Sequence, residues 1–147
     1  MIYDAPRLIV PRLAPWPGEV SMLVRLYVFV EAVLTLIWLD ALGMLGFRFV
    51  HRAVATTSTA TVAVRYDALT LARVAVRDAT IFYFKPVHCL QRSAAVTRLL
   101  RRCGVPATLV IGYLPMPIHC HAWVELNTQV VWDGHSLIAL ARVLDRL

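Results

Sequence analysis

Charge, lysine and glycine-rich loops are scarce in this chain, and each scarcity excludes a class of protein. Charged residues make up only 16% of the 147 residues, and Lys85 is the only lysine, so the formal net charge of +6 comes almost wholly from arginine. The arginines are scattered singly, apart from Arg98, Arg101 and Arg102, which is typical of a solvated helix face and not of a nucleic-acid-binding stripe. We therefore expect no nucleic-acid partner. No glycine-rich phosphate loop is present, so we expect no nucleotide cofactor either.

Cysteine is also sparse, with three residues at positions 89, 103 and 120. Their odd number argues against a disulfide framework, and so does the lack of a signal peptide ahead of them, with its basic start and apolar run. Residues 1–18 instead carry four prolines and are expected to form an arm or a tail. We therefore expect a cytoplasmic protein whose cysteines stay reduced.

Apolar residues are abundant, at 59% of the chain. Residues 20–50 are long enough to span a membrane, but charged residues interrupt them so often that no uncharged run exceeds eight residues. Each charge would cost about 2.5 to 3.5 kcal/mol at the centre of a spanning helix. We therefore expect a helix that ends near Gly43 or Gly46 and contacts a membrane surface at most, without spanning it.

A row of apolar side chains recurs along this helix at helical spacing. It comprises Leu23, Leu26, Tyr27, Val30, Val33, Leu34 and Ile37. We expect the row to pack in the core, and the alternative is a docking face toward another protein or a membrane surface.

A polar stretch at residues 53–61, with four threonines and one serine, separates this region from the rest of the chain. We predict one structural domain, made of an N-terminal arm and apolar helical region at residues 1–60 and a core at residues 61–147. Residues 66–79 are weakly helical. Pro86 excludes a helix across the preceding residue, so the next helix is predicted to begin just after it, at Cys89, and to end near Gly104.

Cys89 therefore lies in the first turn of a predicted helix. The positive end of the helix dipole and the N–H groups of that turn stabilise a thiolate, which makes the cysteine a better nucleophile. The backbone N–H of Cys89 is also a candidate donor to an oxyanion. Cys103, near the other end of the helix, is interpreted as a packing residue.

Three antiparallel strands are predicted after the helix, at residues 108–113, 122–126 and 130–133. The short link between the last two predicts a hairpin, which brings His121 at the start of one strand and Asp133 at the end of the next to one edge of the sheet. Cys89, His121 and Asp133 then form a candidate triad. In it, His121 takes the thiol proton, the thiolate attacks a carbonyl carbon, and Asp133 orients the imidazole.

The neighbouring histidines leave two questions open. His119 lies two residues before His121 on an extended stretch, so its side chain could share the same face. A zinc site drawn from Cys89, Cys120 and these two histidines lacks the usual ligand spacing, and consecutive strand residues face opposite ways, so we expect no metal. The candidate pocket-wall residues are His88, His119 and Trp123.

Three motifs resemble the B2 proteins of lasso-peptide biosynthesis, the microcin-processing leader peptidases of transglutaminase-like type. They are Cys-Leu-Gln-Arg-Ser from Cys89, Arg-Arg-Cys-Gly-Val-Pro-Ala from Arg101 and His-Ala-Trp-Val-Glu from His121, and the resemblance covers residues 86–137. It implies an α+β fold with a transglutaminase-like, papain-like core. In such a core the catalytic cysteine, at a helix N-terminus, packs on a small antiparallel sheet, preceded by apolar N-terminal helices. The resemblance makes Cys89 the nucleophile, His121 the base and Asp133 the orienting carboxylate.

The resemblance also implies a function. It predicts a cysteine protease that cuts a precursor peptide at its leader–core junction, so that a separate lasso cyclase can close the core. The N-terminal region shows no β-rich leader-recognition unit, so we expect the split form of the family, which acts with a separate leader-binding protein. Two alternatives remain: a transglutaminase-like acyltransferase with the same triad, and a non-catalytic membrane-associated scaffold.

Overall fold

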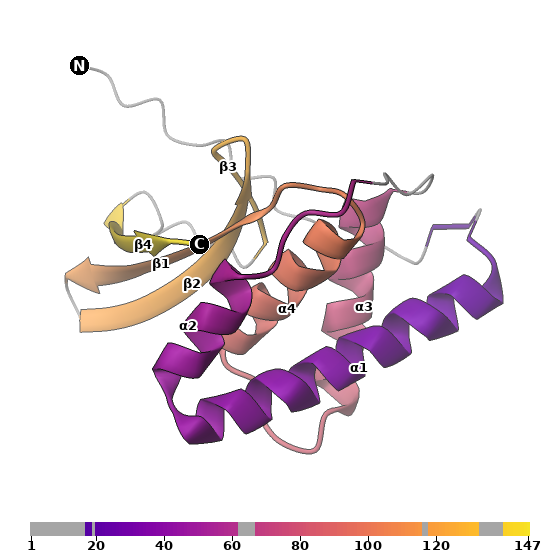
Figure 1. Cartoon of the computed structure of the whole chain (residues 1–147), viewed down its shortest axis with the longest axis horizontal. Coiled ribbons are helices and arrows are strands. Elements are labelled where there is room, and N and C mark those ends of the chain that lie inside the picture. Colours follow the sequence, from indigo (N-terminus) through magenta and orange to yellow (C-terminus); the bar gives the residue numbers. More distant parts are fainter. Residues whose placement is uncertain (1–16, 19, 62–66, 116–117, 133–139) are drawn as a thin grey trace.

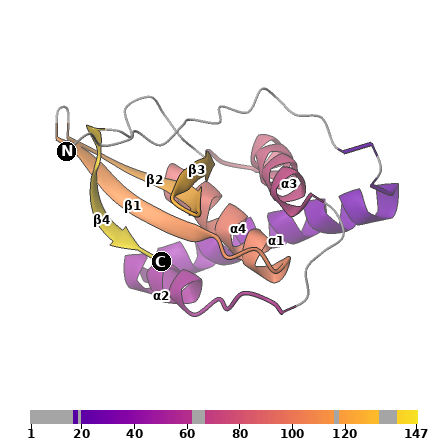
Figure 2. The same cartoon turned by 90° about the horizontal axis from the view of Figure 1, so that it is seen from above.

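Four helices pack against a four-stranded antiparallel sheet in the computed structural model, which describes residues 17–18, 20–61, 67–115, 118–132 and 140–147 (Figure 1). In chain order the elements are α1 (Met22–Leu45), α2 (Phe47–Ala55), α3 (Ala68–Phe82), α4 (Cys89–Arg102), β1 (Thr108–Pro115), β2 (Ile118–Leu126), β3 (Gln129–Trp132) and β4 (Arg142–Arg146). The helices gather on one face of the sheet, with α4 between the strands and α1, as Figure 2 shows from above. The predicted α+β fold is confirmed.

Local sequence signals set the ends of the helices. At the start of α1 the Ser21 hydroxyl accepts a hydrogen bond from the Val24 N–H at 3.4 Å, and the Asp67 carboxylate caps α3 through the Thr70 N–H at 3.1 Å. Gly46 ends α1 as predicted, with a φ of 120° that glycine adopts without steric cost. The chain then enters α2, which the sequence does not predict as a separate helix.

The expectation that the apolar row on α1 packs in the core is wrong, because the helix buries the opposite face. Its buried residues are Ala32, Thr35, Leu36 and Leu39. The predicted row is mostly exposed, with Leu23 at 79% and Leu34 at 56% of full exposure. Because α1 is apolar nearly all round, the spacing of its apolar residues does not identify the buried face. The small side chains of Ala32 and Thr35 let the neighbouring helices approach α1 closely on that face.

By length and composition, α1 would also suffice to cross a membrane. A core helix of a soluble protein passes the same test, and α1 contributes Ala32, Leu36 and Leu39 to a core that it shares with α3 and α4. The expectation that it does not span a membrane stays a prediction.

The strands lie in the order β3-β2-β1-β4, and each neighbouring pair is antiparallel. β2 and β3 form the predicted hairpin, whose turn residues Asn127 and Thr128 have φ values of 48° and 67°. Two consecutive residues with positive φ give the turn that matches the twist of the flanking strands. β4 pairs with the free edge of β1 and is an addition to the three predicted strands.

The core lies between the helices and one face of the sheet. Ala122 and Val124 of β2 belong to this cluster, whereas Trp123 belongs to a smaller cluster with Val110 and Val130. Successive strand residues face opposite sides of a sheet. His121 therefore shares its face of β2 with Trp123.

Of the arginines near the end of α4, Arg102 is exposed as the sequence predicts, whereas Arg101 is not part of a solvated face. Arg101 is buried and donates hydrogen bonds to the backbone carbonyls of Val54, Thr57 and Ala107, at 2.8, 3.2 and 2.8 Å. Arg102 pairs with Glu31 on α1. These side chains hold the end of α4 to the rest of the protein.

Candidate active site

Cys89 is the first residue of α4, as predicted. Pro86 restricts the residue before it, and His88 has the extended conformation of an N-cap, with φ of −77° and ψ of 161°. The side-chain oxygen of Gln91 accepts a hydrogen bond from the His88 N–H at 3.2 Å and closes the first turn. Cys89 is half-buried and lies where the helix dipole favours a negative charge.

A polar cluster ties this helix start to α1. Gln91 Nε2 donates a hydrogen bond to Asp40 Oδ1 at 2.7 Å, and Lys85 Nζ lies 2.7 Å from the same oxygen. The hydrogen bond from Lys85 is the largest influence on the pKa of Asp40, and together with the bond from Gln91 it holds that pKa below its ordinary value. The charged carboxylate thus anchors both the loop before α4 and the first turn of the helix.

Ser93 joins the beginning of α4 to β2. It lies four residues after Cys89, on the same face of the helix, and its fully buried hydroxyl donates a hydrogen bond to the Ala122 carbonyl at 2.9 Å. Ala122 directly follows His121. The bond therefore holds the helix face that carries Cys89 against the strand that carries His121.

The aromatic rings of His119, His121 and Trp123 form a row along one face of β2. Neighbouring ring centroids are 6.3 Å apart, and the planes differ by 24° in the first pair and 18° in the second. His119 is exposed, whereas His121 is only 6% exposed, so burial distinguishes the two histidines between which the sequence left the choice open. Of the predicted pocket-wall residues, Trp123 is buried beside His121, His119 is exposed next to it, and His88 is exposed at the start of α4.

Asp133 lies outside the described residues, so its predicted role stays a prediction. β3 ends one residue before it, at Trp132, which pairs with Val124 of β2. Within the described ranges, no three His, Cys, Asp or Glu side chains gather into a group that could hold a metal ion.

The other two cysteines differ from Cys89 in their surroundings. Burial raises the pKa of Cys103 and outweighs the opposite influence of Arg102, so little of this thiol is ionised at neutral pH. Cys103 also packs against the core, in agreement with its interpretation as a packing residue. Cys120 is exposed on β2.

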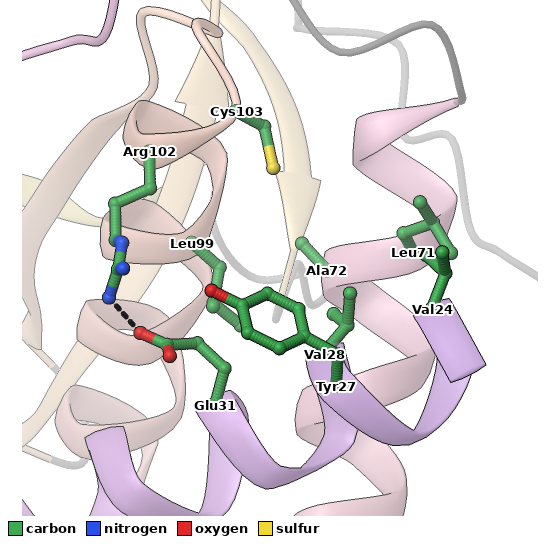
Figure 3. Close-up of a pocket in the computed structure, with 9 residues that line it drawn as sticks. All are labelled: Val24, Tyr27, Val28, Glu31, Leu71, Ala72, Leu99, Arg102 and Cys103. Atoms are coloured by element: carbon green, nitrogen blue, oxygen red, sulfur yellow. Dashed lines mark hydrogen bonds and ion pairs between the residues drawn. The ribbon is translucent and has the colours of Figure 1, made fainter.

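A cavity of about 360 Å³ lies between α1, α3 and the C-terminal end of α4 (Figure 3). Apolar side chains and Cys103 line it, and the ion pair between Glu31 and Arg102 lies beside them. The 14 residues of α4 separate Cys103 from Cys89, which corresponds to about 20 Å along the helix. The cavity is therefore separate from the candidate active site.

Sequence reasoning missed the residues that position the site. Ser93 could have been found, because its spacing of four residues from Cys89 places it on the same helix face. Asp40 and Gln91 carry no such signal, since they are 51 residues apart in the chain. The contact between Trp123 and Glu125, two residues apart on β2, is compatible with strand alternation but does not follow from it.

Comparisons with known proteins point to one family. The family model described as the transglutaminase-like superfamily matches residues 32–144. The microcin J25-processing protein McjB of Escherichia coli is 39% identical over 49 residues, which are 33% of this chain and 24% of McjB. That match spans about a quarter of the relative's length. No solved structure matches the chain.

Proposed function

This chain belongs to the transglutaminase-like superfamily, and we propose that it is a cysteine protease that removes the leader peptide from a lasso-peptide precursor. One observation carries the proposal: α4 begins at Cys89, and its Ser93 is bonded to the residue that follows His121. The similarity to a microcin-processing protein supports the substrate class. We place the reaction in the cytoplasm, where free thiols stay reduced.

In the proposed mechanism, His121 takes the proton of the Cys89 thiol, and the thiolate attacks the carbonyl carbon at the leader–core junction. The backbone N–H of Cys89 donates to the oxyanion, and losing such a donor typically lowers the rate by about 10² to 10³. The C–N bond then breaks, and the leaving amine takes the proton from His121. This amine belongs to the core, which is thereby freed for a cyclase, and water then hydrolyses the thioester and releases the leader from Cys89, while Asp133 orients the imidazole throughout.

The Cys89→Ala variant should lose cleavage of the precursor while it still binds the leader peptide. Cys103→Ala is the matched control, because it also removes a half-buried thiol from an end of α4, and it should cleave like the wild type. Mass spectrometry of the precursor after incubation reads both results. Retained cleavage by Cys89→Ala would rule out the proposed nucleophile.

The two alternatives make different predictions for the same thiol. An acyltransferase would incorporate an added amine into the peptide in place of water, which mass spectrometry of the product detects. A non-catalytic scaffold would show no faster reaction of iodoacetamide at Cys89 than at Cys103 or Cys120. We expect the protease to release an unmodified carboxylate. We also expect Cys89 to be alkylated faster than Cys120, because its thiolate is stabilised at a helix start, and faster than Cys103, because burial raises the pKa of Cys103.

We also propose that a separate leader-binding protein docks on the outer seam of α1. This seam comprises seven exposed side chains spaced alternately by four and three residues: Leu23, Tyr27, Val30, Leu34, Ile37, Ala41 and Met44. A 3.5-residue repeat is the spacing with which one helix packs along another. At the rim of the seam Glu31 and Asp40 are already paired with Arg102 and Lys85, so the spacing of the seam and not its charge indicates the occupant. That spacing favours a helical protein partner.

The Leu34→Glu variant should lose the complex with the co-expressed leader-binding protein in size-exclusion chromatography. Leu144→Glu, on β4, is the matched control, because Leu144 is 61% exposed and Leu34 is 56% exposed. A complex unaffected by Leu34→Glu would exclude this docking face. Loss of self-association or of binding to anionic vesicles, with the partner complex intact, would assign the seam to a second copy or to a membrane and would equally overturn the proposal.

A further inference from the structure

We propose that Glu125 is a positioning residue for His121 and that it acts through the indole of Trp123. The inference rests on the proposed function, because it takes His121 to be the catalytic base. All three residues lie on the same face of β2, at alternating positions of the strand.

Glu125 is buried, at 6% exposure, although it is an acidic residue. Its Oε1 accepts a hydrogen bond from the indole Nε1–H of Trp123 at 2.8 Å, and its Oε2 pairs with Arg146 of β4. A buried carboxylate is costly unless it is paired and hydrogen-bonded. Here both oxygens have partners, and one of these partners is the ring next to His121.

Gly112 provides the space that the indole ring of Trp123 occupies. It pairs directly with His121 across β1 and β2, and a Cβ at this position would lie 2.8 Å from the indole Cη2. The indole therefore lies over the glycine beside the imidazole. The Trp123 and His121 ring centroids are 6.3 Å apart, with planes at 18° to each other. The indole ring thus lies beside the imidazole and nearly parallel to it, and it limits the rotation of the imidazole.

Glu125 determines the position of the Trp123 ring. The indole N–H is buried and needs an acceptor, and the carboxylate supplies one on the side of the ring away from His121. If the acceptor were lost, the ring would have to turn to satisfy its N–H or leave it unpaired. Either change would free the imidazole from its present orientation.

The test is a double-mutant cycle of Glu125→Leu and Trp123→Phe, with Glu125→Gln as the conservative variant. Two readouts are measured: kcat/KM for precursor cleavage, and the pH midpoint of Cys89 alkylation by iodoacetamide. Glu125→Leu should lower kcat/KM by about 10- to 100-fold, as expected when a catalytic group is misplaced by a fraction of an ångström to one ångström. It should also shift the alkylation midpoint.

Glu125→Gln should stay close to the wild type, because an amide oxygen still accepts the indole N–H. Glu125→Leu should have little further effect in Trp123→Phe, which has no N–H to hold. Asp145→Asn is the matched control, since Asp145 is an ion-paired acid of the same sheet, bonded to His51, and it should leave both readouts unchanged.

Additive effects in the cycle would overturn the proposal. A Glu125→Leu variant that unfolds at lower temperature but keeps the wild-type alkylation midpoint would overturn it too, because it would show a purely structural role. The alkylation readout needs no substrate. If the wild type failed to cleave a precursor, the proposed function would fail while the midpoint shift still tested the link between Glu125 and His121.

Discussion

Replacing Ser93 with alanine removes a hydrogen bond that joins α4 to β2. The hydroxyl is fully buried and donates to the Ala122 carbonyl at 2.9 Å, so the substitution takes this donor from a carbonyl in the protein interior. The loss should cost about 1 to 3 kcal/mol. With a urea m-value of about 1 to 3 kcal/mol/M, the unfolding midpoint should fall by roughly 1 M. Urea titration followed by tryptophan fluorescence and circular dichroism measures the change.

Thr97 offers a matched control one turn further along the same helix face. It is also fully buried, but its hydroxyl has no hydrogen-bond partner within the described part of the chain. Thr97→Val replaces this hydroxyl with a methyl group of the same shape, so stability should be unchanged or should rise. If Ser93→Ala were as stable as the wild type, or if Thr97→Val lost as much stability, the hydrogen bond would not be what holds α4 on β2.

Four further substitutions test other contacts by urea denaturation, one of them as a function of pH. Gly112→Ala should cost about 1 to 3 kcal/mol by overpacking, because its Cβ would lie 2.8 Å from a backbone oxygen and an indole ring. Gly43→Ala, with open space around it in the described structure, should gain up to about 1 kcal/mol. Lys85 lowers the pKa of Asp40 below its ordinary value of 3.8, so the charged carboxylate stabilises the fold above that pH. This stabilisation is lost as the pH falls through the lowered pKa. Asp40→Asn should therefore make the free energy of unfolding depend less on pH in the acid range. Arg101→Leu leaves three backbone carbonyls without their donor and should cost about 2 to 5 kcal/mol.

The features that the sequence predicts correctly are fixed by local chemistry. Pro86 excludes a helix across the residue before it, and Gly104, with φ of 81°, closes the helix that follows. Cys89 could therefore be assigned to a helix start from sequence alone. The link between β2 and β3 is also local, and its turn residues Asn127 and Thr128 set the hairpin.

The features that were missed depend on partners far away in the chain. α1 is apolar on nearly every side, so only the packing of α3 and α4 selects its buried face. β4 has five exposed residues and no alternation, and it is a strand because β1 offers it a free edge. Arg101 is buried because carbonyls from two other segments meet its guanidinium. None of these partners can be identified from local spacing.

The three predicted triad residues are now supported unequally. Cys89 is supported by the helix start, its cap and the contrast with Cys103. His121 is supported by its burial and by the Ser93 bond beside it. Asp133 depends on the hairpin register, which is described only as far as Trp132. The structure therefore supports most directly the tests at Cys89 and at the residues that hold His121 in place.

α1 contributes to the candidate site as well as to the proposed docking face. The family match begins at residue 32, inside this helix, and well before the division predicted at residue 60, which stays a prediction about how the chain is organised. Asp40 on α1 holds Gln91 in the first turn of α4, while the outer seam of the same helix is exposed. A partner bound to the seam would thus contact α1, the helix that anchors the start of α4. A chain that began at residue 61 would lose the proposed docking face and the anchor together, so on physical grounds α1 belongs to the same structural unit as α4 and the candidate site.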